Sequence, residues 1–489
     1  MTSEFQVLLA ILLPLAGAAG IALAGRHYPN LRETVTLITA SCLALTVWTL
    51  LPDLLAGERP SARMAEMLPG IAIEFKVEPL GMLFAALASL LWIVNSIYSI
   101  GYMRSNNEQH QTRFYILFAV ALSAVMGIAF AGNLLTLFIF YEVLTLSTYP
   151  LVAHKGDGKT VVSARTYLGI LLATSIGLFL PAMIWTYQVA GTLDFIPGGI
   201  LDGNLAGPAV GLLLALYVFG IGKAAVMPVH RWLPAAMVAP TPVSALLHAV
   251  AVVKAGVFTI TKVVVYIFGV DFLFTESSAD WLLYAAAFTV IVASLVALQQ
   301  KNLKRLLAYS TIAQLSYVVL AIAILKPMSE IGAAIHVVAH AFGKITLFFA
   351  AGSIYTVTKK TEIQQLRGIG RQMPWTMAAF TIGALSMIGV PPTAGFVSKW
   401  FILAGSFQSD NYVAIVTIVV STALNALYFL PIVYYAWFSS EETAPTPDHG
   451  EAPLAIVIAL TVTAALTVLL FFFNQPVLDL ASQLGGSTN

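Results

Sequence analysis

The segment from Lys223 to Lys254 reads KAAVMPVHRWLPAAMVAPTPVSALLHAVAVVK, and it decides how the surrounding chain folds. The sequence around it is apolar enough to form membrane helices. Four prolines nevertheless interrupt the segment, namely Pro228, Pro234, Pro240 and Pro242. Proline removes a backbone donor and breaks a helix, and in a membrane a broken helix is tolerated only where it lines a cavity or is buried in protein. The segment therefore predicts an interrupted membrane helix with Lys223 close to the break.

Apolar segments of membrane-spanning length recur on both sides of this break. Of the 489 residues, 59% are hydrophobic and 10% are charged, whereas charged residues make up roughly 25% of a soluble domain. About 20 apolar residues cross a hydrocarbon core of roughly 30 Å. The sequence predicts an all-α polytopic membrane protein with about fourteen transmembrane helices, at 5–25, 35–52, 79–101, 114–131, 133–152, 164–189, 208–233, 241–268, 281–298, 307–325, 330–357, 375–405, 412–438 and 453–473.

The composition also excludes several classes of function. A net charge of +1 gives no electrostatic case for binding nucleic acid. Cys42 is the only cysteine, so neither a disulfide framework nor a cysteine-based metal or iron–sulfur site is expected, and no cofactor is predicted. The first span, 5–25, has no basic leader in front of it. We therefore expect this span to be retained in the membrane and not cleaved as a signal peptide.

Lysine and arginine are unevenly divided between the loops that join the spans. The odd-numbered loops, counted from the N-terminus, hold fifteen of the 24 basic residues, and the even-numbered loops hold four. Because cytoplasmic loops are enriched in Lys and Arg, the odd-numbered loops are predicted to face the cytoplasm. An even number of spans then puts both termini outside.

The remaining five basic residues lie inside predicted spans, and all are lysines: Lys223, Lys254, Lys262, Lys344 and Lys399. Among the acidic residues, only Glu142 is expected well within a span. Each such charge costs on the order of 2.5–3.5 kcal/mol on insertion scales, so six of them predict a water-accessible interior with a function. Lys262 is the exception. It lies near the end of its span, where we expect its ammonium group to extend to the membrane interface.

A second interruption occurs five spans after the first, in the segment GVPPTAGFVSKW at 389–400. Lys399 lies beside this break, just as Lys223 lies close to the first break. Broken helices at corresponding positions of two halves indicate a transporter built from inverted repeats, with its ion path at the breaks. The residues expected to break the helices are Pro228, Pro234, Pro391, Pro392 and Gly395.

This pattern divides the chain into four parts. Residues 1-110 would form helices 1–3, residues 111-270 the first inverted repeat of five helices, and residues 271-440 the second repeat. Residues 441-489 would hold an acidic loop and the last helix. Five-helix units are inverted relative to each other because an odd number of crossings reverses the direction of the chain.

Between the breaks, the segment HVVAHAFGK places His336, His340 and Lys344 at positions i, i+4 and i+8, on one face of a helix. Histidine changes charge near neutral pH and a desolvated lysine can release its proton there, whereas arginine keeps its charge. Intramembrane bases that are all Lys or His favour proton handling over a fixed counter-ion. The two histidines could instead bind a metal, but no carboxylate or cysteine lies nearby in the sequence, so no metal site is predicted. His248 is either a relay member or a packed polar residue.

Five segments of the sequence resemble the antiporter-like subunits shared by Mrp-type cation/proton antiporters, respiratory complex I and membrane-bound hydrogenases. The segments are FIFYEVLTLSTYPLVA, KAAVMPVHRWLPAAMVAPTPVSALLHAVAVVKAG, QQKNLKRLLAYSTIAQLSY, HVVAHAFGKITLFFAAG and SMIGVPPTAGFVSKW. The similarity extends over nearly the whole chain. It implies that Glu142 of the fifth helix pairs with Lys223 of the broken seventh helix. It also implies a proton path formed by Glu142, Lys223, His248, Lys254, His336, His340, Lys344 and Lys399.

Within this family the sequence is most similar to the Mrp D type. A lysine at position 399 departs from the complex I member that carries glutamate there, and the chain ends too soon for the lateral helix of the largest complex I member. The resemblance implies a proton-translocating subunit of a multi-subunit Na⁺/H⁺ antiporter in a bacterial or archaeal cell membrane, without a catalytic centre of its own. The implied partners are subunits of the Mrp A, B, C, E, F and G type, together with H⁺ and Na⁺ or K⁺.

Other functions remain open from the sequence. The main alternative is a proton-pumping subunit of a complex I or group 4 membrane-bound hydrogenase assembly. A scaffold subunit that conducts nothing and a stand-alone solute transporter are further alternatives. The sequence shows no nucleotide-binding or redox motif, so a driving force other than an ion gradient would have to come from partner subunits.

Overall fold

The computed structural model describes residues 3–68, 70–439 and 450–484, and it is built almost entirely of helices. Twelve helical segments in this part of the chain are long and apolar enough to cross a membrane, judged by length and composition. They coincide with twelve of the predicted spans, so the predicted all-α polytopic fold is confirmed. The predicted spans 208–233 and 375–405 are each interrupted. Most of the predicted acidic loop, residues 440–449, lies outside the described residues.

The first part of the chain ends at the C-terminus of the predicted eighth span. Its helices are α1 (Ser3–Ala24), α2 (Pro29–Trp48), α3 (Leu51–Leu55), α4 (Pro79–Ser105), α5 (Gln111–Ala129), α6 (Leu134–Val152), α7 (Gly158–Thr174), α8 (Leu180–Ala190), α9 (Pro208–Gly220), α10 (Trp232–Ala235), α11 (Thr241–Ala245) and α12 (Val252–Lys262). A π-helical segment, Leu246–Val250, joins α11 to α12, and a second one, Val263–Phe268, extends α12. The eighth span is continuous because Pro242 lies in the first turn of α11, where a proline is tolerated.

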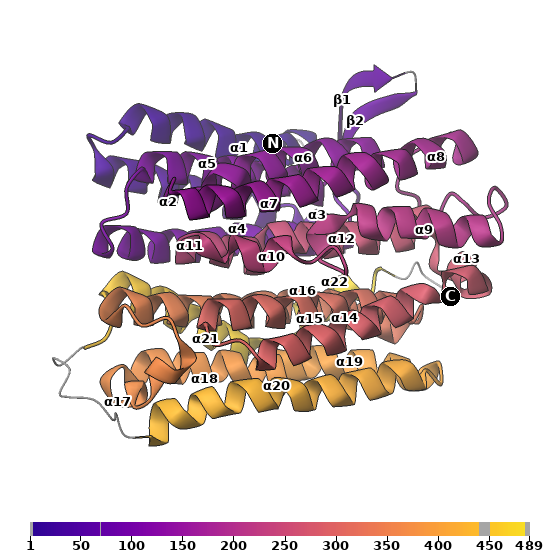
Figure 1. The fold of residues 1–489 in the computed structure, drawn as a ribbon. Helices are drawn as coiled ribbons and strands as arrows, with labels where there is room; N and C mark the ends of the chain where they lie inside the picture. Colours follow the sequence, from indigo (N-terminus) through magenta and orange to yellow (C-terminus); the bar gives the residue numbers. More distant parts are fainter. Residues whose placement is uncertain (1–2, 69, 440–449, 485–489) are drawn as a thin grey trace.

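The second part contains the other interrupted span. Its helices are α13 (Val270–Thr275), α14 (Trp281–Leu298), α15 (Leu303–Ala323), α16 (Pro327–Thr358), α17 (Ile369–Gln372), α18 (Pro374–Ile388), α19 (Ala394–Gln408), α20 (Tyr412–Phe438), α21 (Leu454–Phe472) and α22 (Gln475–Ala481). The long helices run side by side, with the N-terminal half of the chain in one group of layers and the C-terminal half in the other (Figure 1).

Helix α16 connects the two halves. It packs against α4 and α11 of the first half and against α15, α18 and α19 of the second. Its hydropathy is high enough for a membrane span, yet its most apolar stretch is completely buried inside the protein. The histidines and lysine of the predicted polar face therefore lie in the interior, where the two halves meet.

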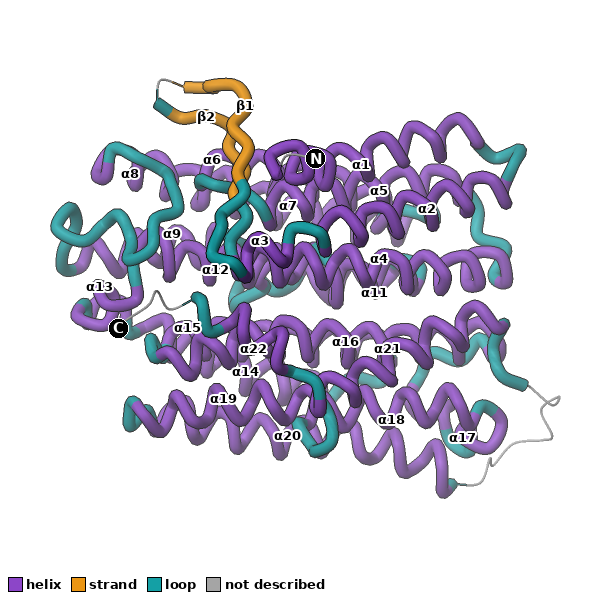
Figure 2. The backbone as a smooth tube through the Cα atoms, turned by 180° about the vertical axis from the view of Figure 1, so that it is seen from behind, coloured by secondary structure: helices purple, strands orange, loops and turns teal. Residues whose placement is uncertain are grey.

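A β-hairpin projects from the helices, in a region for which the sequence predicts only a polar loop (Figure 2). Strands β1 (Ser61–Leu68) and β2 (Ile71–Lys76) pair antiparallel, with Ala62 opposite Phe75. The apolar segments of this region are too short for their pattern to distinguish a two-stranded hairpin from a loop. Such a hairpin is stable only when it packs against the rest of the protein.

A close approach of two backbones joins α12 to the first break. A Cβ atom added to Gly256 of α12 would overlap the backbone of Lys223 and Ala224. Only glycine leaves room for this contact, because every other residue carries a Cβ atom. Gly256 therefore determines how closely the eighth span approaches the lysine of the seventh.

We expect Gly256→Ala to destabilise the protein by about 1–3 kcal/mol, the usual cost of overpacking a buried site. Gly169→Ala is the matched control, because the position lies in the middle of α7 and a Cβ atom there would meet no other atom within 4 Å. Thermal unfolding of the two purified variants in detergent measures the difference. Equal unfolding temperatures for both variants would show that the contact at Gly256 does not constrain the fold.

Candidate functional site

The second break, residues 389–393, separates α18 from α19. In a continuous α-helix, each backbone carbonyl accepts a hydrogen bond from the N–H four residues later. For Met387 and Ile388 those later residues are Pro391 and Pro392, which have no N–H. The two prolines thus leave two buried carbonyl oxygens free to accept hydrogen bonds from side chains.

Lys399 donates to both of these carbonyl oxygens. Its Nζ lies 3.1 Å from the oxygen of Met387 and 2.8 Å from that of Ile388, and it also lies 3.3 Å from Thr422 Oγ1. The side chain is buried, and no carboxylate lies within 4.0 Å of Nζ among the described residues. Lys399 is therefore held by neutral acceptors alone, so that no counter-ion fixes its charge.

Gly395 brings α19 close to the end of α18. Its backbone N–H donates to Ser386 Oγ at 3.3 Å, and an added Cβ atom would overlap the carbonyl of Ser386. The carbonyl of Gly395 in turn accepts from Ser398 Oγ at 3.0 Å. The glycine thus positions the first turn of the helix that carries Lys399.

The first break places Lys223 in a 3-10 turn after the end of α9. Its Nζ donates to the carbonyl of Tyr141 at 2.8 Å and to Thr145 Oγ1 at 2.6 Å, and it lies 3.1 Å from the centroid of the Tyr141 ring. The two acceptors come from α6 and are neutral. Pro228 follows this turn and Pro234 lies in the short helix α10.

The predicted ion pair between Glu142 and Lys223 is not formed in the described structure. None of the three ion pairs found among the described residues includes either side chain. Both carboxylate oxygens of Glu142 are buried without a hydrogen-bond partner. Glu142 follows Tyr141 in α6, so its side chain leaves the helix about 100° away from the Tyr141 ring, against which the ammonium group lies.

The central titratable groups lie on α12 and α16, and each is at most 2% exposed. Lys254 Nζ lies 2.7 Å from His340 Nδ1. Lys344 Nζ donates to Ser310 Oγ at 2.9 Å. The structure therefore joins Lys254 of the eighth span directly to His340 of the eleventh, a contact that spacing along one helix does not reveal.

His336 links the central groups toward the second break. Its ring lies 6.2 Å from the ring of His340, and its Nδ1 lies 2.9 Å from Ser398 Oγ. The single hydrogen of Ser398 Oγ can point to the Gly395 carbonyl, in which case His336 Nδ1 donates, or to His336 Nδ1 itself, so the direction of this contact depends on the tautomer of His336. His248 lies apart in the π-helical segment before α12, where its ring nitrogens have no hydrogen-bond partner among the described residues.

The prediction that Lys262 extends to the membrane interface is wrong. Its side chain is fully buried instead of extending to the membrane interface, and its Nζ lies 2.8 Å from Glu78 Oε2. The ammonium group also donates to the carbonyl of Ala131 at 2.8 Å and lies 3.9 Å from the centroid of the Phe195 ring. Glu78 immediately precedes α4 and is itself buried.

Glu78 is a functional candidate that a search for acidic residues well within a span does not find. One local signal could have revealed it, since Glu78 stands directly before Pro79, the first residue of α4. A carboxylate at this place is favoured by the positive end of the helix dipole. Among the described residues, Lys262 is thus the buried lysine that forms an ion pair with a carboxylate, and it differs in this respect from Lys223, Lys254, Lys344 and Lys399.

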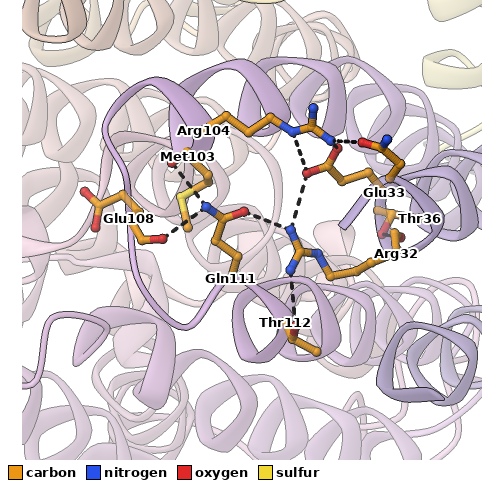
Figure 3. Close-up of polar contacts among 9 residues, drawn as sticks. Arg32, Glu33, Thr36, Met103, Arg104, Glu108, Gln111 and Thr112 are labelled. Atoms are coloured by element: carbon orange, nitrogen blue, oxygen red, sulfur yellow. Dashed lines mark hydrogen bonds and ion pairs between the residues drawn. The ribbon is translucent and has the colours of Figure 1, made fainter. Parts of the chain in front are cut away.

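A charge cluster in which Arg32 and Glu33 are buried and Arg104 is half-exposed joins α2, α4 and α5 (Figure 3). Glu33 forms ion pairs with Arg104 and with its neighbour Arg32. Arg32 also donates to Gln111 Oε1 at 2.8 Å and to Thr112 Oγ1 at 3.2 Å. Both arginines belong to predicted loops, but the structure buries Arg32. Because Glu33 binds both arginines and Arg32 also binds α5, this group holds three helix ends together.

A cavity of about 270 Å³ opens beside the N-terminus of α11. Its lining includes Tyr102, Thr241, Lys304 and Ala351. Lys304 belongs to a predicted loop, yet its Nζ donates to the carbonyl of Ala239 at 2.6 Å. The cavity lies at the end of the protein where the odd-numbered loops gather, and it offers room for water close to the segment that carries His248.

Residues 131–425 match the family model described as NADH:quinone oxidoreductase/Mrp antiporter, transmembrane. The sequence is 30% identical over 500 aligned residues to NADH-quinone oxidoreductase subunit N of Desulforudis audaxviator, covering 98% of each chain. It is 26% identical to the D-type subunit of the Na⁺/H⁺ antiporter of Alkalihalophilus pseudofirmus, covering 98% of this chain and 96% of the relative.

A solved structure has the same fold. The chain matches one in the Mrp complex from Dietzia sp. with a TM-score of 0.87 and 22% identity, covering 99% of this chain and 97% of the other. The family model covers more than half of the 489 residues, and the relatives align over almost the full length. The chain therefore belongs to the NADH:quinone oxidoreductase/Mrp antiporter transmembrane family and is a multi-pass, antiporter-like membrane subunit.

Proposed function

We propose that the chain is the proton-translocating membrane subunit of a multi-subunit Na⁺/H⁺ antiporter, of the Mrp D type. The observation that carries this proposal is a row of four buried lysines whose hydrogen-bond partners are all neutral. The lysines are Lys223, Lys254, Lys344 and Lys399. Such a lysine can lose its proton without leaving a buried carboxylate unpaired, which would be costly.

The contact between Lys254 and His340 supports proton transfer between helices. At 2.7 Å, Lys254 Nζ and His340 Nδ1 are within hydrogen-bonding distance, and a hydrogen bond needs a lone pair on one of the two nitrogens. The pair therefore holds at most one proton between these two atoms. When the proton leaves Nζ for Nδ1, the lysine becomes neutral and the histidine becomes charged, and the total charge is unchanged.

The proposed path runs from Lys223 through Lys254 and His340 to Lys344 and then to Lys399. The close packing of Gly256 against the first break supports the step from Lys223 to Lys254. We assign Glu142 the role of a switch. Its carboxylate lacks a partner in this conformation, so it can attract the ammonium group of Lys223 in another conformation and release it again.

We also propose that residues 111-270 and 271-440 are inverted repeats, with the odd-numbered loops in the cytoplasm and both termini outside. The support is that each half contains a broken helix with a buried lysine held by backbone carbonyl and hydroxyl oxygens. Lys223 binds those of α6, and Lys399 binds two carbonyls at its own break and one hydroxyl of α20. The excess of Lys and Arg in the odd-numbered loops supports the orientation. The proposed partners are membrane subunits of the Mrp type, and the proposed exchanged ions are H⁺ and Na⁺ or K⁺.

A second candidate function is a proton-pumping subunit of a complex I assembly. The 30% identity to an N-type subunit of NADH-quinone oxidoreductase favours it. The two candidates share the proton path and differ in the driving force, which would be a cation gradient in one case and electron transfer in partner subunits in the other. Purification of the native assembly distinguishes them, because only the second would copurify with redox subunits.

The proposal is tested by replacing Lys223 and Glu142 separately with alanine in the native assembly. We expect each variant to lower cation/proton exchange in membrane vesicles by at least about tenfold, since positioned proton carriers typically contribute 10²–10⁴-fold. The exposed Lys301 supplies the control variant Lys301→Ala, which should exchange normally. Normal exchange by both test variants at normal assembly levels would favour the scaffold alternative and reject the proposal.

A further inference from the structure

The carbonyl oxygen of Met387 is surrounded by three hydrogen-bond donors. Lys399 Nζ lies 3.1 Å away, and Gln314 Nε2 and Asn425 Nδ2 each lie 3.3 Å away. A backbone carbonyl has two lone pairs, so it cannot bind three donors equally well. The strength with which Asn425 binds this oxygen therefore affects how strongly the ammonium group of Lys399 is held.

Asn425 is connected to Lys344 through two hydroxyl groups. The hydroxyl of Tyr428 lies against Asn425 Oδ1 and is 3.0 Å from Ser310 Oγ. Ser310 Oγ in turn accepts from Lys344 Nζ at 2.9 Å. A tyrosine hydroxyl carries one hydrogen, so Tyr428 can donate to Ser310 or to Asn425 but not to both at once.

We propose that Ser310, Tyr428 and Asn425 form a relay of reorienting hydrogen bonds that opposes simultaneous protonation of Lys344 and Lys399. This inference rests on the proposed function, in which both lysines carry protons. The relay would couple the two lysines through defined contacts in addition to their direct repulsion. In this role the three residues are positioning residues, because they hold and release the carriers without carrying the proton themselves.

When Lys344 is charged, its ammonium group donates to Ser310. The hydrogen of Ser310 then points to Tyr428, and Tyr428 donates to Asn425 Oδ1. Because hydrogen bonds in a chain polarise one another, Asn425 Nδ2 becomes a better donor to the carbonyl of Met387. The hydrogen bond from Lys399 Nζ to the same carbonyl then becomes weaker, which favours the neutral form of the lysine.

When Lys344 is neutral, the chain of hydrogen bonds reverses. The lysine nitrogen accepts the hydrogen of Ser310, and Ser310 Oγ accepts the hydrogen of Tyr428. Asn425 Oδ1 then loses its donor, so Nδ2 binds the carbonyl of Met387 less strongly. Lys399 regains that carbonyl, which favours its charged form. Only hydroxyl hydrogens rotate in this cycle, and no bond to hydrogen breaks within the relay.

The surroundings protect the relay from competition by bulk water. Ser310, Asn425 and Tyr428 are each at most 4% exposed. The titratable side chains that face the relay and Lys399 are Lys344 and His336 of α16 and Tyr317 of α15. Tyr317 stacks on His336 with ring centroids 5.5 Å apart, and Lys399 Nζ lies 5.0 Å from the centroid of the Tyr317 ring.

The test is Tyr428→Phe in the native assembly, with cation/proton exchange measured in vesicles between about pH 6 and pH 10. The variant removes the hydroxyl that donates to Asn425 Oδ1, so Asn425 competes less for the Met387 carbonyl. The hydrogen bond from Lys399 to this carbonyl then stays strong, and the lysine holds its proton to higher pH. We expect the alkaline limb of the exchange profile to move up by about 0.5–1 pH unit, the equivalent of one net hydrogen bond. The matched control is Tyr434→Phe, six residues later on α20 and 59% exposed, which should leave the profile unchanged.

Serine variants make the test independent of tyrosine packing. Ser310→Ala leaves Asn425 Oδ1 as the acceptor for the Tyr428 hydroxyl, so it should move the alkaline limb down, opposite to Tyr428→Phe, whereas Ser310→Thr keeps the hydroxyl and should restore the wild-type profile. Wild-type profiles for Tyr428→Phe and Ser310→Ala, together with loss of exchange in Lys344→Ala, would overturn the relay and leave the proposed function standing. Normal exchange by both Lys344→Ala and Lys399→Ala would instead overturn the proposed function, and the relay with it.

Discussion

Replacing Lys399 with arginine is expected to lower cation/proton exchange about a hundredfold, although the positive charge is kept. Lys399 is held by backbone carbonyls and one hydroxyl, with no counter-ion among the described residues. If transport requires this group to release its proton, a guanidinium cannot replace it because it stays protonated at every relevant pH. Loss of a positioned proton carrier typically costs 10²–10⁴-fold.

The measurement is the exchange rate in vesicles that contain the native assembly, for Lys399→Arg and Lys399→Met side by side. Both variants should be impaired, since one cannot release a proton and the other cannot bind one. Lys326→Arg is the control, because that lysine lies between two spans outside the proposed path. Exchange at the wild-type rate by Lys399→Arg would mean that position 399 serves as a fixed charge.

The parts of the site that follow from local chemistry could be predicted from the sequence. A proline removes the N–H of its own residue, so the break at Pro391 and Pro392 and the lysine beside it can be recognised within a dozen residues. The identical reasoning identifies the break near Lys223. Helical spacing likewise places His336, His340 and Lys344 on one face of a single helix.

The parts that depend on contacts between distant segments could not be predicted. The pair of Lys262 with Glu78 joins α12 to the start of α4, and nothing near Lys262 in the sequence indicates a partner. Ser310 and Tyr428 are common residue types in membrane helices, and only the packing of α15 against α20 and α16 brings their hydroxyls together. The absence of the implied ion pair between Glu142 and Lys223 has a similar cause. A resemblance to a family can imply that two residues pair, but it does not tell in which conformation of the protein they do so.

Replacing Lys262 with methionine is expected to destabilise the protein strongly, by about 3–5 kcal/mol, the usual cost of removing one partner of a buried ion pair. The variant leaves the carboxylate of Glu78 buried without its counter-ion. Combining Lys262→Met with Glu78→Leu removes both charges, and exchange of a whole buried pair for apolar residues is often neutral. The double variant should therefore recover most of the lost stability, measured by thermal unfolding in detergent.

The same double variant decides whether Lys262 belongs to the proton path. Proton release is unfavourable for a buried lysine that is paired with a carboxylate, because it leaves the negative charge of the carboxylate without a counter-ion. We therefore expect the assembled double variant to exchange cations and protons at close to the wild-type rate. Recovered stability without recovered exchange would contradict this expectation and would make Lys262 and Glu78 members of the path. Recovery of both would instead show that the row of proton carriers is limited to the lysines whose partners are neutral.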